Sequence, residues 1–385
     1  MSRQTFDVAV IGAGVFGAWG AYQLRCDGAD VVLIDAYGPG NSRASSGGES
    51  RMIRMGYGPD EIYTRMAQRS LTVWQELFNL AGSPQFFQPT GILWLARDGD
   101  AYCEATLKTF ETCGVKHQRL SRSEIETRYP QLDLGDISCG ILEPDSGCLM
   151  ARQPVREVVA RARRDGVVYL NAAVSSDILR ETTLRSIQTS GEEIFAKTFI
   201  FACGPWLPKL FPSLLSQRIH VTRQEVFFFG VPETGASAFG PKEMSAWIDF
   251  GDLVYALPNL ESRGYKLAID AHGPTFDPDT GDRIVSTEGL IAARAYLSRR
   301  VPLLANAPVT ETRFCQYENT SNGDFLIDRH PDFENVWLVG GGSGHGFKHG
   351  PAIGEYVAGL ISSTTPPEPR FSLATKERVQ ERKVF

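Results

Sequence analysis

The chain has 385 residues, of which 42% are hydrophobic, 10% aromatic and 22% charged. This composition is ordinary for a globular protein and excludes a disordered or low-complexity chain. The 39 basic and 45 acidic side chains give a formal net charge of −6, so the chain has no basic excess that would attract nucleic acid or an anionic membrane. At about 150 residues per domain, we expect two or three domains and neither of these partners.

The two ends and the cysteines exclude further classes. The apolar run over residues 6–11 is short and contains Asp7, so it predicts a buried strand and not a signal peptide. No uninterrupted apolar stretch approaches the ~20 residues of a membrane-spanning helix. Residues 383–385 do not match the Ser-Lys-Leu type of peroxisomal address, and we expect a cytoplasmic protein. The seven cysteines contain no Cys-x-x-Cys pair, which argues against a disulfide framework or a metal site.

Residues 6–35 carry a Gly-x-Gly-x-x-Gly fingerprint in the strand–helix–strand context that a dinucleotide site requires. A strand over 6–11 leads into the glycines, a helix follows that Gly28 ends, and a second strand covers 31–34. The three glycines of the fingerprint are Gly12, Gly14 and Gly17. This context predicts a bound dinucleotide but does not separate FAD from NAD.

Each residue of the fingerprint has a physical role. Gly12 permits the tight turn, Gly14 lets the pyrophosphate approach the backbone, and Gly17 lets the helix pack closely on the strand. The first helical N–H groups and the positive end of the helix dipole favour the phosphates. Asp35, at the tip of the second strand, can accept hydrogen bonds from a ribose diol.

The next part of the chain departs from a simple nucleotide fold. A polar, glycine-bearing loop over residues 38–54 stands where a third strand is expected. A helix is predicted from about Asp60 to Gly82, because its apolar positions keep a helical spacing. Over residues 85–149 the pattern is strand-like and mixed.

The second half alternates helices and strands. Helices are predicted over residues 155–164, about 291–303 and about 351–361. Strands are predicted over residues 167–170, 196–201, 224–229, 264–269 and 336–339. A turn at residues 190–193 suggests a small antiparallel layer, and residues 221–320 are β-rich.

Glycine-rich, phosphate-capable segments therefore lie near both ends of the chain, at 12–17 and 340–346. This layout predicts an α/β (α+β) fold, in which a Rossmann-type nucleotide domain built from separated segments is interrupted by a β-rich antiparallel-sheet substrate domain. The nucleotide domain is predicted to comprise residues 1–84, 150–220 and 321–385. The substrate domain is predicted to comprise residues 85–149 and 221–320.

Taken together, these motifs resemble the FAD-dependent amine oxidases of the monomeric sarcosine oxidase type. Related members act on N-methyltryptophan, pipecolate and fructosyl amino acids. The resemblance covers nearly the whole chain and rests on motifs in the same order. These are the fingerprint ending in Asp35, Ser50-Arg51-Met52-Ile53-Arg54, Ala202-Cys203-Gly204-Pro205-Trp206, Cys315-Gln316-Tyr317 and Ser343-Gly344-His345-Gly346-Phe347-Lys348.

The resemblance implies that the nucleotide domain binds FAD and that Cys315 forms a thioether with the flavin 8-methyl group. It also implies that Arg54 and Lys348 hold a substrate carboxylate. An amino acid must be oriented so that a C–H bond next to its nitrogen faces the flavin, and a two-point cationic clamp achieves this. Arg suits the planar, bidentate part, whereas Lys supplies a point charge.

Four further residues are implied to act at the flavin. Lys266 matches a lysine that assists the reaction of reduced flavin with oxygen, since a buried ammonium stabilises superoxide. Arg51 is expected to place a positive charge near the ring, and Tyr255 and Tyr317 match aromatic residues of the substrate cavity. The remaining cofactor-binding residues implied are Ser50, Val174, Gly344, Gly346 and, again, Lys348.

Two positions depart from the family pattern. Gly47 stands where the family often has a His, and Asp270 stands where members similar to sarcosine oxidase carry a His. An acid at position 270 could favour a cationic group on the substrate. Both departures leave open whether sarcosine is the substrate, whereas the class of amine oxidation is unaffected.

The sequence thus predicts a monomeric enzyme that uses FAD to oxidise a secondary amino acid, N-alkyl or cyclic, to an imine. The electrons go to oxygen and yield hydrogen peroxide, and the protein supplies orientation and charge. Two alternatives stay open. One is a dehydrogenase of the same fold with another electron acceptor, and the other is a non-catalytic flavoprotein subunit.

Overall fold

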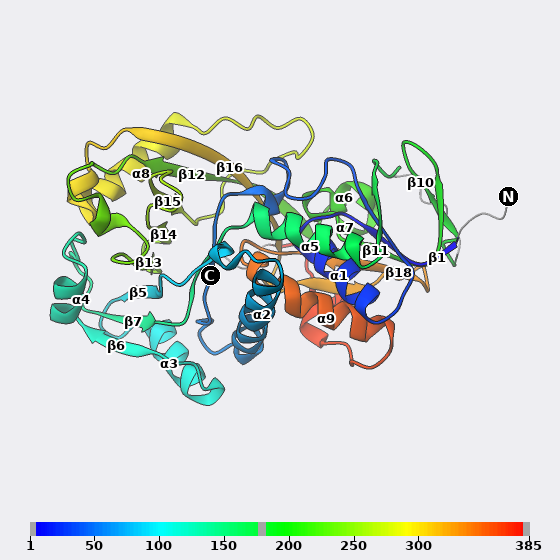
Figure 1. The fold of residues 1–385 in the computed structure, drawn as a ribbon, viewed down its shortest axis with the longest axis horizontal. Helices are drawn as coiled ribbons and strands as arrows, with labels where there is room; N and C mark the ends of the chain where they lie inside the picture. The colour runs from blue at the N-terminus through cyan, green and yellow to red at the C-terminus, as the bar shows by residue number, and fades with distance from the viewer. Residues whose placement is uncertain (1–4, 176–181, 380–385) are drawn as a thin grey trace.

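The computed structural model describes residues 5–175 and 182–379. Residues 383–385, on which the expected cytoplasmic location partly rests, lie outside these ranges. Within them the chain forms two large sheets that lie side by side along the long axis of the molecule (Figure 1). Segments from both ends of the sequence, blue and orange to red in Figure 1, meet around the right-hand sheet.

The first sheet has seven strands in the order β17-β18-β11-β1-β2-β9, with β10 paired to β11. Its strands are β1 (Thr5–Ile11), β2 (Val31–Asp35), β9 (Val168–Asn171), β10 (Ser186–Gln188), β11 (Glu193–Phe201), β17 (Leu326–Arg329) and β18 (Val336–Gly340). The contacts from β18 to β9 are parallel, whereas β17 and β10 pair antiparallel. The predicted Rossmann-type sheet is confirmed, and the turn at 190–193 adds β10 to it instead of forming a separate layer.

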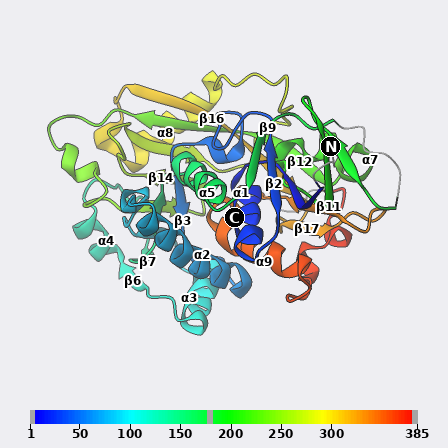
Figure 2. The same ribbon diagram turned by 45° about the vertical axis from the view of Figure 1, so that its right-hand side comes forward.

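Helices pack on the first sheet. They are α1 (Val15–Cys26), α5 (Arg152–Arg164) and α9 (Gly350–Ile361), with the short α6 (Leu207–Leu210) and α7 (Pro212–Leu215) nearby. A Cβ added at Gly354 of α9 would lie 2.8 Å from the carbonyl oxygen of Trp19, so glycine is what lets α9 approach α1. The long helix α2 (Glu61–Leu80) lies against α9 at the boundary between the two halves in both views (Figures 1 and 2).

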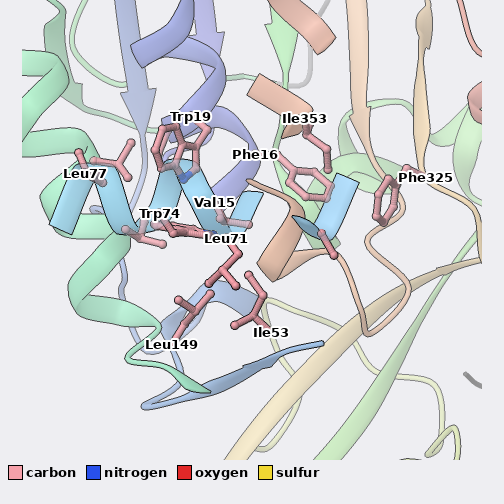
Figure 3. Close-up of a cluster of buried hydrophobic side chains, with 14 of the residues drawn as sticks. Val15, Phe16, Trp19, Ile53, Leu71, Trp74, Leu77, Leu149, Phe325 and Ile353 are labelled. Atoms are coloured by element: carbon pink, nitrogen blue, oxygen red, sulfur yellow. The ribbon is translucent and has the colours of Figure 1, made fainter. Parts of the chain in front are cut away.

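An aromatic cluster joins α1, α2 and the loop before α9. The rings of Trp19 and Trp74 lie 5.0 Å apart edge to face, and Phe347 stacks on Trp74 at 5.9 Å. Figure 3 shows the two tryptophans among buried aliphatic side chains of the same helices. The indole N–H of Trp74 donates to the carbonyl of Lys348 at 3.1 Å. The core therefore fixes the backbone of the glycine-rich loop that carries Lys348.

The second sheet has eight strands in the order β16-β12-β15-β14-β13-β5-β7-β6. Its strands are β5 (Ile92–Ala96), β6 (Gln118–Ser121), β7 (Cys139–Glu143), β12 (Ile219–Phe229), β13 (Ala246–Asp249), β14 (Val254–Leu257), β15 (Tyr265–Ile269) and β16 (Val309–Thr320). All neighbours pair antiparallel except β13 and β5, which are parallel. The helix α8 (Thr287–Arg300) packs on β12 and β15. The β-rich part of the α/β fold is thereby confirmed.

The region 85–149 contains two helices that the strand-like interpretation missed, α3 (Ala101–Cys113) and α4 (Arg122–Arg128). Both begin at capping residues. The Asp100 carboxylate accepts hydrogen bonds from the first backbone N–H groups of α3, and Ser121 forms a capping box with Glu124. These local signals outweigh the mixed apolar pattern, because caps satisfy the N–H groups that the first helical turn leaves unpaired.

A third, small sheet was also not expected. It consists of β3 (Arg51–Ile53), β8 (Gly147–Leu149) and β4 (Phe87–Gln88), in the order β3-β8-β4. The end of the predicted loop over 38–54 is therefore a strand, which pairs antiparallel with residues almost a hundred positions away. This pairing fixes the position of the segment that carries Arg51 and Arg54.

The packing at the fingerprint yields a test of stability. A Cβ at Gly17 would overlap the carbonyl oxygen of Gly12, whereas a Cβ at Gly20, in the same helix, meets nothing within 4 Å. We expect Gly17→Ala to lower the free energy of unfolding by about 1–3 kcal/mol. Gly20→Ala should raise it by up to about 1 kcal/mol through helix propensity. Urea unfolding followed by circular dichroism measures both, and equal midpoints would contradict the close packing.

Candidate cofactor and active site

A cavity of about 420 Å³ lies at the carboxyl ends of the parallel strands of the first sheet. This edge is where open α/β sheets bind their ligands. The predicted cofactor-binding residues that line it are Gly12, Gly14, Asp35, Arg51, Val174, Cys315, Gly344 and Gly346, together with the predicted catalytic residue Tyr317. The cavity thus runs from the fingerprint to Cys315 on β16 of the second sheet.

A second cavity of about 100 Å³ adjoins the first. It is lined by the predicted residues Ser50, Arg51, Arg54, Tyr255, Lys266, Cys315, Tyr317, Gly344 and Lys348, and by Asp270. Five residues line both cavities, namely Arg51, Cys315, Tyr317, Gly344 and Phe347. The structure therefore gathers every predicted site residue except Gly17 around two adjoining cavities, and Gly17 serves the packing beneath them.

At the fingerprint end, the backbone is held for a ligand to approach. Gly12 has φ +105°, which other residues rarely adopt, and a Cβ there would overlap the Ala202 carbonyl oxygen. A Cβ at Gly14 would meet only the Ser46 hydroxyl, at 3.5 Å, so this side of the turn is open. The carboxylate of Asp35 accepts hydrogen bonds from the backbone N–H groups of residues 13, 37 and 38 at 2.7–2.9 Å. It holds the turn in shape.

At the other end, Arg51 lies between the two cavities. Its guanidinium donates to the carbonyls of Ser45 and Ser50, both at 2.8 Å, and to the Cys315 sulfur at 3.4 Å. These acceptors carry no full negative charge. The positive charge is therefore held in place at the junction and stays available to an anionic ligand.

Lys266 on β15 points into the second cavity and is only 3% exposed. Its Nζ donates to the Ser50 carbonyl at 2.8 Å. Burial, together with the nearby charge of Arg51, lowers the pKa of Lys266 to about 7. At neutral pH the charged and neutral forms of Lys266 are therefore both populated, because burial disfavours the charged form of a lysine.

Arg54 and Lys348 are buried on the same side of the second cavity. The guanidinium of Arg54 lies 4.4 Å above the ring of Tyr57 and 5.1 Å above that of Trp94. Lys348 Nζ donates to the Tyr57 hydroxyl at 2.7 Å and to the His345 carbonyl at 3.0 Å. Tyr57 contacts both cations and so links their positions. The sequence reasoning missed it, although it follows Arg54 by three residues.

Glu143 is a second residue that the sequence reasoning missed. It is fully buried at the end of β7, and its carboxylate accepts hydrogen bonds from the Met55 and Gly56 N–H groups at 2.7 and 3.1 Å. It also accepts from the indole of Trp94 at 2.7 Å. Glu143 therefore fixes the backbone just after Arg54. The sequence signal that could have identified it is a single acid at the end of an apolar strand, since a buried acid needs hydrogen-bond partners.

The two positions that depart from the family pattern have different consequences. A Cβ at Gly47 would overlap the Asn41 carbonyl oxygen, so the loop leaves no room for a histidine. Asp270 accepts a hydrogen bond from the Tyr317 hydroxyl at 2.6 Å in the wall of the second cavity. Burial and the charge of Asp270 raise the pKa of Tyr317 well above its usual range, and burial likewise raises that of Tyr255. Both phenols stay neutral.

Glu318 follows Tyr317 on β16 and was also missed. It lines the first cavity and is 8% exposed. Its Oε1 accepts a hydrogen bond from the Gly342 N–H at 3.3 Å, whereas its Oε2 has no partner. Burial raises the pKa of Glu318 to about 7. A buried oxygen without a protein partner in a cavity wall is available to hydrogen-bond with a bound ligand.

These features fit an extended dinucleotide. The cavity joins a glycine turn at a helix N-terminus to a cysteine beside an arginine, and it contains an orphaned polar atom. Across residues 5–175 and 182–379, no set of three or more His, Cys, Asp or Glu side chains is placed to hold a metal ion. In the same ranges, none of the helices has the length and apolar character to cross a bilayer.

Comparisons with known proteins agree with this geometry. A family model described as FAD dependent oxidoreductase matches residues 7–360. The chain is 30% identical over 367 residues to a monomeric sarcosine oxidase of Bacillus sp. (strain B-0618), with 92% of each chain covered. It is 26% identical over 361 residues to an N-methyl-L-tryptophan oxidase of Salmonella heidelberg (strain SL476), covering 94% of this chain and 96% of that protein.

Among solved structures, L-proline dehydrogenase from P. horikoshii matches with a TM-score of 0.83 and 21% identity. The match covers 96% of this chain and 97% of that one. At this identity the likeness shows a shared fold and nothing about the substrate.

Proposed function

Because the chain belongs to the FAD dependent oxidoreductase family, we propose that it oxidises a secondary amino acid, N-alkyl or cyclic, to an imine, with oxygen reduced to hydrogen peroxide. The observation that carries this proposal is the buried pair Arg54 and Lys348 in a small cavity that adjoins the dinucleotide cavity at Cys315. The named relatives, a sarcosine oxidase and an N-methyl-L-tryptophan oxidase, support an N-methyl amino acid as the substrate class.

The residues that would hold FAD line the first cavity, except Ser50 and Lys348, which line the adjoining second cavity. Gly12, Gly14, Asp35 and Val174 would receive the adenosine and phosphates, and Ser50, Arg51, Gly344, Gly346 and Lys348 would lie toward the flavin. When bound, FAD supplies the redox chemistry, since it accepts a hydride equivalent from the carbon next to nitrogen and passes the electrons to oxygen. The protein's own contribution is to bind, orient and shield the substrate.

Arg54 and Lys348 would form the carboxylate clamp. Both side chains are 5–6% exposed, so little water competes with the carboxylate, and charge-assisted hydrogen bonds are strong in such a place. Tyr57 contacts both cations, and Glu143 fixes the backbone beside Arg54. The clamp thereby holds the substrate in the orientation that the reaction requires, and this lowers the entropic part of the barrier.

Asp270 would face the other end of a substrate that is held by the clamp. Its carboxylate, which accepts a hydrogen bond from Tyr317, places a negative charge in a cavity wall that also contains several cationic side chains. This arrangement supports a substrate whose amino group, or a further cationic group, is held near Asp270.

We propose three further properties. The division into an FAD-binding domain of residues 1–84, 150–220 and 321–385 and a substrate domain of residues 85–149 and 221–320 is supported by the two separate large sheets. The monomeric state is supported by the name of the bacterial relative. A cytoplasmic location remains the expectation from the sequence.

The clamp is tested by anaerobic bleaching of the flavin with N-methyl, cyclic and glycated amino acids. We expect at least one of them to bleach the enzyme. Arg54→Gln should require about 10–100-fold more of it, because a hydrogen bond to a charged group contributes about 1.5–3 kcal/mol. The exposed Arg65→Gln serves as the matched control and should behave as the parent. No bleaching by any compound would contradict amine oxidation and favour a non-catalytic flavoprotein.

The oxygen reaction is tested through Lys266. The pKa of Lys266 is lowered to about 7, so its positive charge is present below this pH and lost above it. Stopped-flow reoxidation by oxygen should slow as the pH rises through about 7. Lys266→Gln should be about 100-fold slower at pH 6 and independent of pH, because it lacks the charge. Reduced enzyme that yields no peroxide but reduces an artificial acceptor would instead indicate a dehydrogenase.

Covalent attachment is tested by acid precipitation. We propose that Cys315, whose sulfur lies at the junction of the two cavities beside Arg51, carries the flavin as a thioether. Forming this bond releases two electrons and two protons, which oxygen accepts. The yellow colour should stay in the pellet for the parent and for Cys203→Ala, a control thiol of the same cavity. It should pass into the supernatant for Cys315→Ala, and colour lost from the parent would exclude the bond.

A further inference from the structure

Glu318 is a buried acid with no charged partner in the part of the chain that the structure describes. Its Oε1 accepts from the Gly342 N–H at 3.3 Å, and its Oε2 is unpartnered. A buried carboxylate costs much free energy unless it is paired, so the group is stabilised by keeping its proton. Since Oε1 is the acceptor, Oε2 is the oxygen that carries a proton and can donate it.

The groups around Glu318 add no positive charge. The loop after β18 presents backbone N–H groups, and β12 places Val221 opposite Glu318. From the end of β11, the thiol of Cys203 faces it, and burial together with the charge of Asp35 raises the pKa of that thiol. On this side of Glu318 the titratable groups are thus a neutral thiol and, beyond it, the carboxylate of Asp35.

Glu318 lines the first cavity together with the fingerprint glycines and Cys315. Its Oε2 is 3.9 Å from the position of a Cβ on Gly204, just after β11, and its Oε1 is 3.3 Å from the position of one on Gly342. The same Gly342 position lies 3.9 Å from the ring of Phe16 in α1. Phe16 belongs to the helix that follows the fingerprint turn, and Cys315 precedes Glu318 by three residues on β16. A dinucleotide that extends from the fingerprint to Cys315 would therefore pass close to Glu318.

We propose that Glu318 is a cofactor-binding residue, whose protonated carboxyl group donates a hydrogen bond from Oε2 to an oxygen of the ribityl–pyrophosphate part of FAD. The proposal rests on the proposed binding of FAD in the first cavity. An ionised carboxylate would repel the doubly negative pyrophosphate, whereas the neutral acid provides the donor that this segment needs. It also satisfies Oε2 of Glu318, a buried carboxyl oxygen that has no partner among the described residues.

This arrangement links FAD binding to proton uptake. Without the cofactor, burial sets the pKa of Glu318 at about 7, and the phosphate charges raise it further in the complex. Above pH 7 the carboxyl group must therefore gain a proton before it can bind FAD. The affinity then falls by up to about tenfold for each unit of pH.

The test uses the full chain with Cys315→Ala, so that FAD binds reversibly. Flavin fluorescence gives the Kd of FAD from pH 6 to 9, and calorimetry at pH 8 in two buffers of different ionisation enthalpy counts the protons. We expect uptake of about one proton and a Kd about 50-fold weaker at pH 9 than at pH 7. Glu318→Gln in this background keeps a donor and should lack both effects, beyond what other groups such as Lys266 contribute equally to the two proteins. Glu311→Gln, which removes an acid from the same strand, should show both.

Groups such as Lys266 contribute equally to the parent and to Glu318→Gln, so the difference between them isolates Glu318. Equal proton uptake and equal pH dependence in the two proteins would overturn the proposal. So would a folded Glu318→Gln protein that binds no FAD at any pH, because its amide offers the same donor. Failure of the Cys315→Ala protein itself to bind FAD would instead overturn the proposed function.

Discussion

The burial of positive charge at the junction of two sheets is the constraint on which the site depends. Arg51, Arg54, Lys266 and Lys348 all lie around one small cavity, and removing such groups from water is costly. Their described acceptors include backbone carbonyls and the Tyr57 hydroxyl. These neutral acceptors hold the cations in position without cancelling their charge, so the cavity favours anions before any ligand arrives.

Packing and strand pairing outside the cavity hold these cationic residues in place. The aromatic cluster of Trp19, Trp74 and Phe347 anchors the loop of Lys348, and the small sheet β3-β8-β4 anchors the segment of Arg51. The two buried acids Glu143 and Glu318 differ from each other in their hydrogen bonding. Glu143 is surrounded by donors and serves as a structural anion, whereas Glu318 has an oxygen without a partner and faces the cofactor cavity.

Sequence patterns found the elements whose signals are local. The fingerprint turn, the helix from Asp60 and the strands near both ends were predicted close to their observed bounds. The helices α3 and α4 were missed because their apolar residues form no clear helical pattern, and their N-terminal capping residues are the main local signal for them. The strand β3 was missed because it exists only by pairing with β8, which no local pattern encodes.

The sequence by itself determined the chemistry available to this protein. The glycine turn and the acid at position 35 were identifiable from motif and spacing, whereas the cysteine at 315 and the cationic residues were implied by the resemblance to the sarcosine oxidase type of amine oxidase. Only the tertiary structure decided how they combine, with two cavities that share Arg51 and Cys315, and with Tyr57, Glu143 and Glu318 added to them. The physical reason is that burial and hydrogen bonding between distant segments set these roles, and neither is encoded in neighbouring residues.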